Sequence, residues 1–182
     1  MQQLSGIKII EHKLGLFWRG MTKESPLFPT FYQSDTFIAT ALSVIVLAKF
    51  GRRGIILVGN IGVSFVGSLL EAFFIAEDDW QLEFSDGALG FIVVFTIIFG
   101  FTIGPVVWLY VPEIVPPKIV PLATFMNWLG VSFCVIATPI IDEKYGSPYP
   151  MFLFFGVVEL GFFILNLFLV IETKGLEPTE IA

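Results

Sequence analysis

The sequence predicts an all-α integral membrane protein with five membrane-spanning helices. Of its 182 residues, 55% are hydrophobic and 14% are charged, and a soluble domain of this length needs more polar surface to cover its core. The apolar residues gather in five runs separated by links that contain charge and proline. Each run is apolar around its whole circumference rather than along one stripe, which is typical of helices embedded in lipid.

The five runs approach or exceed the ~20 residues that a helix needs to cross a bilayer. The third run would be about 37 Å long if it were wholly helical. Since the hydrocarbon core is about 30 Å thick, this helix should tilt, kink at Pro105 or project from the bilayer. The predicted spans are residues 31–50, 54–76, 87–111, 120–141 and 150–171. Together they form a transmembrane bundle of residues 31–175, and residues 176–182 form a tail.

Residues 1–30 differ from the rest of the chain. Charged residues interrupt every window of about 20 residues in this segment, and Pro26 and Pro29 close it. We interpret it either as the remnant of a membrane span or as an amphipathic segment that lies at the membrane interface.

Gly104 and Pro105 interrupt the third run. Proline lacks a backbone N–H and its ring crowds the preceding turn, so Pro105 should kink or unwind its helix. In lipid such a break is tolerated only where it faces protein or a water-filled cavity, and transporters build substrate sites at broken helices. Trp108, three residues further on, would give that opening an aromatic face. The stretch therefore predicts a transport-type helix.

Glu159 lies near the middle of the fifth run, where an ionisable group is costly. Such a residue is by default a functional candidate, here as an acid that couples proton movement to transport. The alternative is that Glu159 forms a hydrogen bond to a neighbouring helix.

The basic residues predict the orientation of the bundle. The links after the first and third runs hold Lys49, Arg52, Arg53 and Lys118, and the tail holds Lys174. Because cytoplasmic links carry an excess of Lys and Arg, these links and the C-terminus should lie in the cytoplasm. With five spans, residues 1–30 would then lie outside, although they also contain basic residues.

Composition argues against several other classes of protein. The net charge is −6 and no basic patch suggests a nucleic-acid partner. The single histidine, His12, and the single cysteine, Cys134, lie far apart, and no His, Cys or acidic group has the spacing of a metal site. No nucleophile stands beside a base. We therefore expect no enzymatic activity, no metal and no cofactor.

Five short motifs occur in a fixed order along the chain. They are QQLSGI at residues 2–7, GRR at 51–53, GPVVWLYVPEI at 104–114, NW at 127–128 and ETKG at 172–175. Together they resemble the sugar porters of the major facilitator superfamily over nearly the whole chain. The resemblance implies the C-terminal half of a twelve-span hexose transporter, with a degenerate seventh-span remnant followed by spans eight to twelve.

The resemblance also implies a set of site residues. Gln2, Gln3, Trp108 and Asn127 match sugar-binding positions, and amides with an aromatic ring suit the hydroxyls and flat C–H face of a sugar. A second set would form a charged latch at the cytoplasmic gate: Arg52, Arg53, Glu113 and Glu172. The alternative for the latch is a group of exposed ion pairs worth under about 1 kcal/mol each. Lys8 departs from the family, which has a sugar-binding asparagine there.

Two functions follow from these observations. The first is the C-terminal half of a hexose transporter that works by alternating access, inactive alone and completed by an N-terminal six-span half or a partner polypeptide. The second is a non-transporting membrane protein that packs against a full-length transporter and modulates it. By analogy with the family, the lipid bilayer in question is the plasma membrane.

Overall fold

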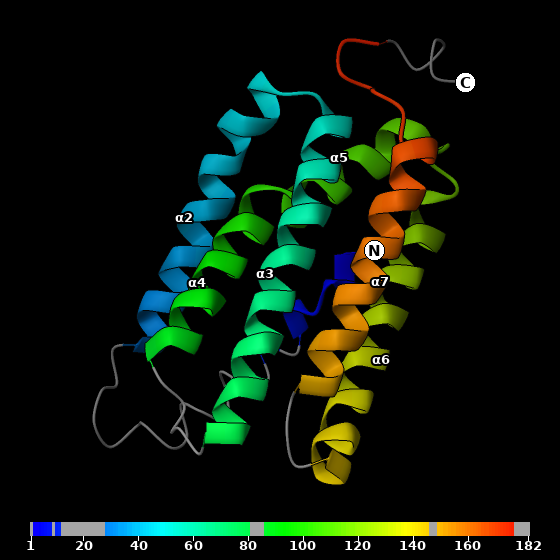
Figure 1. The fold of residues 1–182 in the computed structure, drawn as a ribbon. Helices are drawn as coiled ribbons and strands as arrows, with labels where there is room; N and C mark the ends of the chain where they lie inside the picture. The colour runs from blue at the N-terminus through cyan, green and yellow to red at the C-terminus, as the bar shows by residue number, and fades with distance from the viewer. Residues whose placement is uncertain (1, 9, 12–27, 81–85, 146–148, 177–182) are drawn as a thin grey trace.

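The computed structural model describes residues 2–8, 10, 11, 28–80, 86–145 and 149–176. It is a bundle of long helices packed around a short 3-10 helix that lies inside the bundle (Figure 1). The elements run in the order η1 (Gln2–Ser5), α2 (Phe28–Lys49), α3 (Arg52–Trp80), α4 (Asp86–Phe101), α5 (Ile103–Ile114), α6 (Val120–Tyr145) and α7 (Tyr149–Leu169). The predicted all-α class is therefore confirmed.

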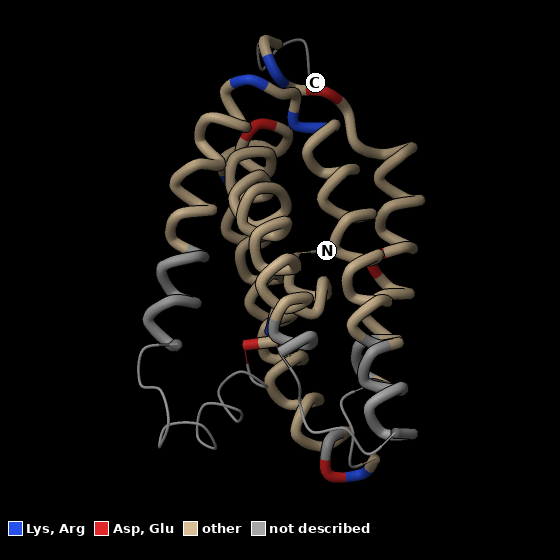
Figure 2. Tube along the Cα trace, turned by 60° about the vertical axis from the view of Figure 1, so that its left-hand side comes forward, with Lys and Arg blue, Asp and Glu red and all other residues tan. Residues whose placement is uncertain are grey.

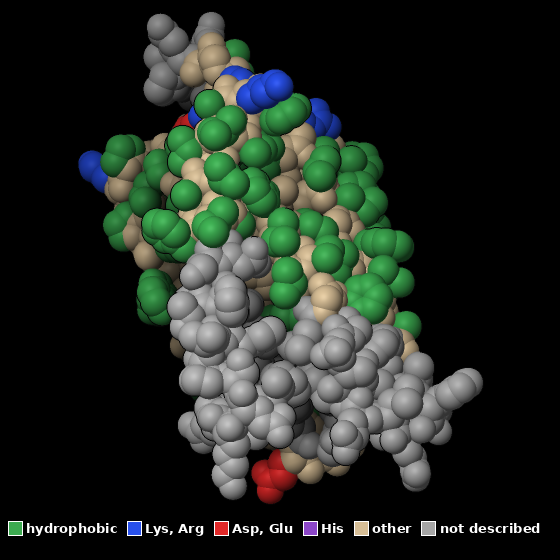
Figure 3. Space-filling view, turned by 90° about the vertical axis from the view of Figure 1, so that its left-hand side faces the viewer, with side chains coloured by type: hydrophobic (Ala, Val, Ile, Leu, Met, Phe, Trp, Pro, Cys, Tyr) green, Lys and Arg blue, Asp and Glu red, His purple; other side chains and the backbone are tan. Residues whose placement is uncertain are grey.

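Three described stretches are long and apolar enough to cross a membrane, namely Arg52–Leu70, Gly90–Ile114 and Val120–Tyr145. Two shorter apolar stretches, Phe37–Lys49 and Leu153–Leu169, lie within α2 and α7. These five stretches correspond in order to the five predicted runs. Apolar side chains also cover the outside of the bundle, as Figure 3 shows for one face. Phe37 and Phe168 are 74% and 82% exposed, which suits contact with lipid rather than water.

The third predicted span is broken at Thr102, and not at Pro105 as the sequence suggested. Thr102 has non-helical dihedral angles (φ −123°, ψ −94°) and separates α4 from α5. Pro105 then falls in the first turn of α5, where an N–H would lack an intrahelical partner in any case. Without that N–H the Phe101 carbonyl loses its partner four residues ahead, so the ladder fails upstream of the proline.

Residues 2–10, apart from the undescribed residue 9, lie largely inside the bundle. Ile10 is fully buried, and Ile7 packs with it in a core cluster that includes Val63, Phe95 and Phe155. The interpretation of residues 1–30 as a span remnant or as an interfacial segment stays a prediction. Residues 12–27 lie outside the described residues, and α2 begins at Phe28, earlier than the predicted start at residue 31.

Most of the charged residues lie toward the ends of the bundle, and an acidic position lies between them (Figure 2). Arg52 begins α3, Glu113 lies in the last turn of α5, and Glu172 follows α7. These three residues meet at the end of the bundle that is nearest the C-terminus, which we call the charged end. The long apolar stretches lie between the two ends, as a bilayer requires.

Candidate functional site

The short helix η1 brings two glutamines into the centre of the bundle. Gln2 is buried, and the Ser5 hydroxyl closes the turn by donating to the Gln2 carbonyl (2.9 Å). Gly6 follows with φ 88°, in the left-handed region that favours glycine. A helical turn resumes after it, since the Ile10 N–H donates to the Gly6 carbonyl (3.2 Å). The QQLSG sequence thus holds both amides in a fixed direction.

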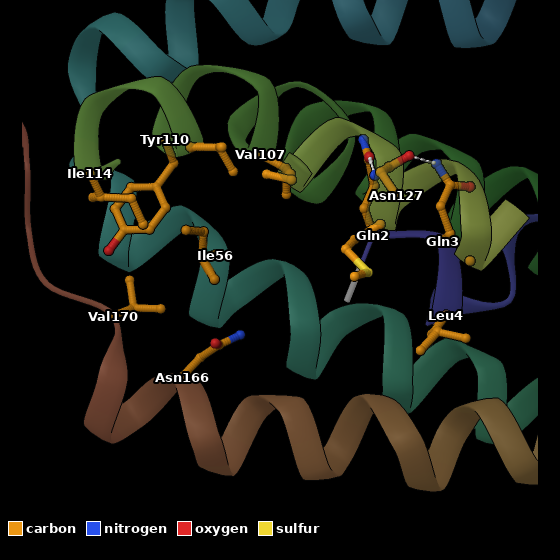
Figure 4. Close-up of a pocket in the computed structure, with 14 residues that line it drawn as sticks. Gln2, Gln3, Leu4, Ile56, Val107, Tyr110, Ile114, Asn127, Asn166 and Val170 are labelled. Atoms are coloured by element: carbon orange, nitrogen blue, oxygen red, sulfur yellow. Dashed lines mark hydrogen bonds between the residues drawn. The ribbon is translucent and has the colours of Figure 1, made fainter. Parts of the chain in front are cut away.

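Three of the four residues expected to bind sugar meet in one hydrogen-bonded network. Asn127 on α6 donates from Nδ2 to Gln2 Oε1 (2.7 Å), and its Oδ1 accepts from Gln3 Nε2 (3.0 Å). Gln2 Nε2 donates to the Gly104 carbonyl at the start of α5 (2.7 Å). The network therefore connects η1, the segment after the helix break, and α6, and the close-up shows it at one end of a cavity (Figure 4).

The break in the helix brings the Gly104 carbonyl to this network. Gly104 lies two residues after Thr102, and a Cβ on it would come within 3.0 Å of the Phe99 carbonyl oxygen. The Thr102 hydroxyl donates to the Ile98 carbonyl (2.5 Å) and so satisfies one of the carbonyls at the end of α4. Glycine, threonine and proline together allow α4 to stop and α5 to restart.

The cavity has a volume of about 410 Å³ and lies between η1, α3, α5, α6 and α7. Its polar lining residues are Gln2, Gln3, Tyr110, Asn127 and Asn166, and the rest of the lining is largely apolar. Gln2, Gln3 and Asn127 lie at one end, and Tyr110 and Asn166 lie toward the other (Figure 4). A mostly apolar cavity of roughly 300–1,000 Å³ with a few convergent polar groups is the usual form of a small-molecule site.

Trp108 does not line this cavity. It is 51% exposed and borders a neighbouring hollow of about 40 Å³, which Asn127 also borders. The structure thus joins Gln2, Gln3 and Asn127 in one network and leaves Trp108 on the other side of Asn127. The roles of all four residues in binding sugar stay predictions.

Sequence reasoning did not single out Tyr110 and Asn166. The Tyr110 hydroxyl donates to the Ile171 carbonyl (3.2 Å) and accepts from the Ile171 N–H (3.1 Å). It therefore ties α5 to the segment after α7. A polar amide in an otherwise apolar run was the available signal for Asn166. For Tyr110 there was none, because an aromatic residue in an apolar run is ordinary packing.

The four residues of the predicted charged latch lie together at the charged end. The Arg52 guanidinium binds the Glu113 carboxylate (Nη2 to Oε1, 2.9 Å), and Thr173 Oγ1 lies 2.5 Å from the other carboxylate oxygen. Arg53 instead donates from Nη2 to the Leu167 carbonyl (2.9 Å). Of the two arginines, only Arg52 pairs its side chain with a latch carboxylate among the described contacts.

Glu172 binds backbone rather than arginine side chains. Its carboxylate accepts from the N–H groups of Arg52 (2.8 Å), Arg53 (3.3 Å), Thr173 (3.1 Å) and Lys174 (3.0 Å). Partial burial raises the pKa of this carboxyl, but the four backbone hydrogen bonds outweigh that effect and the pKa is lowered overall. The negative charge also complements the positive end of the α3 dipole.

Glu159 is fully buried on α7 and does not line the cavity. Neither of its carboxylate oxygens has a hydrogen-bond partner among the described residues. Glu159 would therefore not contact a ligand in the cavity, and its role as a coupling acid stays a prediction. The predicted spans also contain Asp35 and Glu71, whose side chains lie outside the described part of the chain.

These features define a class of protein. A bundle of membrane-crossing helices, one of them broken beside a cavity with convergent amides, is the architecture of a membrane transporter. The chain belongs to the Sugar (and other) transporter family, whose sequence profile matches residues 1–182. The resemblance stated from the motifs is confirmed by this match.

Individual relatives agree with the family. Facilitated glucose transporter member 2 of solute carrier family 2 from Rattus norvegicus is 32% identical over 188 residues, covering 100% of this chain and 35% of the relative. Hexose transporter 1 from Plasmodium yoelii yoelii is 27% identical and covers 96% of this chain and 35% of the relative. A glucose transport protein from Synechocystis is 29% identical, with 96% and 40% covered. The chain thus spans 35–40% of the length of these relatives.

A solved structure shares the fold. The inward-open conformation of the xylose transporter XylE from E. coli matches with a TM-score of 0.78 at 20% sequence identity. The match covers 99% of this chain and 39% of that chain. The helices described above are therefore arranged as in that solved structure.

Proposed function

We propose that this chain is the C-terminal bundle of a hexose transporter that works by alternating access. The observation that carries the proposal is the Gln2–Asn127–Gln3 network on a cavity of about 410 Å³. Family membership supports it, as do relatives whose names specify hexose or glucose transport. A binding and transport role, not an enzymatic one, is the proposed activity.

The chemistry of the cavity suits a hydroxyl-rich ligand. Each carboxamide has one acceptor oxygen and two N–H donors, and the network uses only part of this capacity. Gln3 Oε1 is buried with no hydrogen-bond partner among the described residues, so it can accept from a sugar hydroxyl. The apolar lining, which includes Ile56 and Val107, suits the C–H face of the sugar.

The charged end would act as the cytoplasmic gate in this proposal. The Arg52–Glu113 pair joins the start of α3 to the last turn of α5, and Thr173, which follows α7, also contacts Glu113. Glu172 caps α3. Hydrogen-bonded charge pairs of this kind can break and re-form when the elements of a gate move. The positive-inside rule supports a cytoplasmic position for this end and for the C-terminus, and analogy with the family supports the plasma membrane.

Alternating access requires two bundles that move against each other. The chain spans 35–40% of the length of its relatives, so we propose that a six-span N-terminal bundle or a partner polypeptide supplies the other wall of the sugar pathway. Trp108, half exposed, borders the neighbouring hollow beside Asn127 and would contact the sugar or the second bundle there. Alone, the chain should not transport sugar.

Reconstitution tests this function. Liposomes that contain the chain alone should show no saturable uptake of labelled glucose, and co-reconstitution with an N-terminal six-span bundle of a hexose transporter should restore uptake that excess unlabelled glucose blocks. Asn127→Leu should raise the KM about tenfold, because a buried hydrogen bond to the sugar is lost. Ser132→Ala is the control, since the exposed Ser132 hydroxyl donates to its own helix at the Trp128 carbonyl.

Two outcomes would contradict the proposal. Competable uptake by the chain alone would show that no second bundle is needed. Stable binding to a full-length transporter, with altered uptake by that transporter and no uptake through the chain itself, would favour the non-transporting modulator.

A further inference from the structure

The described part of the interface between α3 and α7 contains two buried polar side chains that have no hydrogen-bond partner and lie outside the cavity. Asn60 on α3 and Glu159 on α7 are both 0% exposed. Both polar atoms of Asn60 and both carboxyl oxygens of Glu159 lack a hydrogen-bond partner among the described residues. Buried polar atoms are nearly always paired, so this concentration on two facing helices requires an explanation.

The register of the two helices brings Asn60 and Glu159 to the same level. The Ser64 hydroxyl donates to the Gly156 carbonyl (3.1 Å), and Arg53 donates to the Leu167 carbonyl (2.9 Å). The two contacts are 11 residues apart on each helix, so α3 and α7 run antiparallel alongside each other. Asn60 precedes Ser64 by four residues and Glu159 follows Gly156 by three, which places them within about 1.5 Å of one level.

Asn60 also lies on the side of α3 that faces α7. Residues 53, 60 and 64 follow the spacing of one helix stripe, and both ends of this stripe contact α7. Gly156 and Glu159 are three residues apart on α7 and so share a face. The amide and the carboxyl therefore belong to the same helix–helix interface.

Other hydrogen-bond donors near this level are already used. The Ser64 hydroxyl donates to the Gly156 carbonyl, and the Ser68 hydroxyl donates to the Ser64 carbonyl. A hydroxyl has a single O–H donor. The Asn60 carboxamide can satisfy one Glu159 oxygen through Nδ2, but its own Oδ1 then still needs a donor.

Two described basic side chains on elements near this interface have partners elsewhere. Arg52 pairs with Glu113 at the charged end, and Lys8 after η1 pairs with Glu11 (2.6 Å). Lys144 is exposed at the far end of α6. Among the described residues, no cation pairs with Glu159, and an unpaired buried carboxylate in a membrane span is strongly disfavoured.

We propose that Asn60 and Glu159 form a binding site for a single proton. The proton comes from water and binds a Glu159 carboxylate oxygen, which gives a neutral carboxylic acid. The acid O–H then donates to Asn60 Oδ1 while Asn60 Nδ2 donates to the remaining acid oxygen. All four unpartnered atoms gain a partner, and α3 and α7 are joined by two hydrogen bonds at a site that is separate from the cavity.

Infrared spectroscopy of the full chain in lipid nanodiscs tests the proposal. The wild type should show the carbonyl band of a protonated carboxyl group, and Glu159→Gln should abolish that band. Glu143→Gln, at an exposed position near the end of α6, should leave it unchanged. Asn60→Leu should keep the band but shift it to higher frequency, because the acid carbonyl loses its N–H donor. A purely steric role for Asn60 would not produce this shift.

A second measurement needs no variant. Dicyclohexylcarbodiimide reacts with protonated carboxyl groups in apolar surroundings, so mass spectrometry of the treated wild type should find Glu159 labelled in preference to Glu143. Absence of both the protonated band and the label at Glu159 would overturn the proposal. Loss of the band on addition of Na⁺ at constant pH would also overturn it, because the occupant would then be a cation.

Discussion

Glu172 shows how one motif residue holds a helix end in place. Its carboxylate accepts four backbone N–H groups, two of them from the first residues of α3. A Cβ at Gly51 would overlap this carboxylate, so the residue before α3 must be glycine for Glu172 to approach. The ETKG and GRR motifs are 119–120 residues apart and meet in this one contact.

Neutralising Glu172 should destabilise the bundle in a pH-dependent manner. The pKa of Glu172 is lowered in the folded chain, so its stabilising effect is present above the pKa of the unfolded chain and is lost as the pH falls through the folded pKa. Glu172→Gln should lower the free energy of unfolding by about 0.5–1 kcal/mol at neutral pH. The free energy of unfolding of this variant should also fall less than that of the wild type as the pH decreases.

The single, buried Cys134 provides the measurement. A thiol-reactive dye reports thermal unfolding when Cys134 becomes accessible, and midpoints can be compared from neutral to acidic pH. Glu143→Gln serves as the control. Identical pH profiles for Glu172→Gln and the wild type would exclude this role of Glu172.

At the scale of the elements, the junction between α4 and α5 depends on close approach by α3. A Cβ at Gly59 would meet Thr102 Oγ1 at 2.5 Å and Ile103 Cγ1 at 2.8 Å. Helix α3 thus packs its glycine against the non-helical residue, where a larger side chain would separate the two elements. The break is therefore supported by tertiary packing as well as by Pro105.

Gly59→Ala should destabilise the bundle by about 1–3 kcal/mol through overpacking, even though alanine favours the helix by about 1 kcal/mol. Gly161→Ala is the matched control, because a Cβ at Gly161 has nothing within 4 Å, and it should be neutral or slightly stabilising. The thiol-dye assay at Cys134 measures the thermal unfolding midpoint of each variant, and Gly59→Ala should have the lower one. Equal thermal midpoints for the two variants would mean that α3 can shift at the junction without loss of stability, which would contradict the prediction.

At the scale of the whole molecule, basic residues are distributed unequally between the two ends of the bundle. Arg52, Arg53, Lys118 and Lys174 belong to the links and the segment at the charged end. Lys144 lies at the opposite end, next to Glu143. This asymmetry supports an orientation with the charged end in the cytoplasm.

Cysteine labelling in intact cells should reveal this orientation. On a Cys134→Ser background, Lys144→Cys should react with a membrane-impermeant maleimide from outside. Lys118→Cys should react only after the membrane is permeabilised. Both lysines are exposed, so access rather than burial decides the result. The reverse pattern would contradict the proposed orientation.

The sequence predicted the class and the order of helices because lipid imposes its demands locally, on every residue of a span. The resemblance to sugar porters also predicted Gln2, Gln3 and Asn127 as residues of one site. The position of the helix break was wrong by three residues, because the hydrogen bond that Pro105 removes belongs to the preceding turn. Tyr110 was not foreseen, because its partner, Ile171, is 61 residues away.

By itself, then, the sequence determined that this chain is an all-α membrane protein with five apolar runs and sugar-porter motifs in a fixed order. These properties follow from composition and short motifs. Only the tertiary structure decided that Glu172 caps α3, that Trp108 lies outside the cavity, and that Asn60 and Glu159 are both buried without a described hydrogen-bond partner. Each of these depends on the register of helices that are distant in the chain, and that register is set by packing of the whole bundle rather than by any one segment.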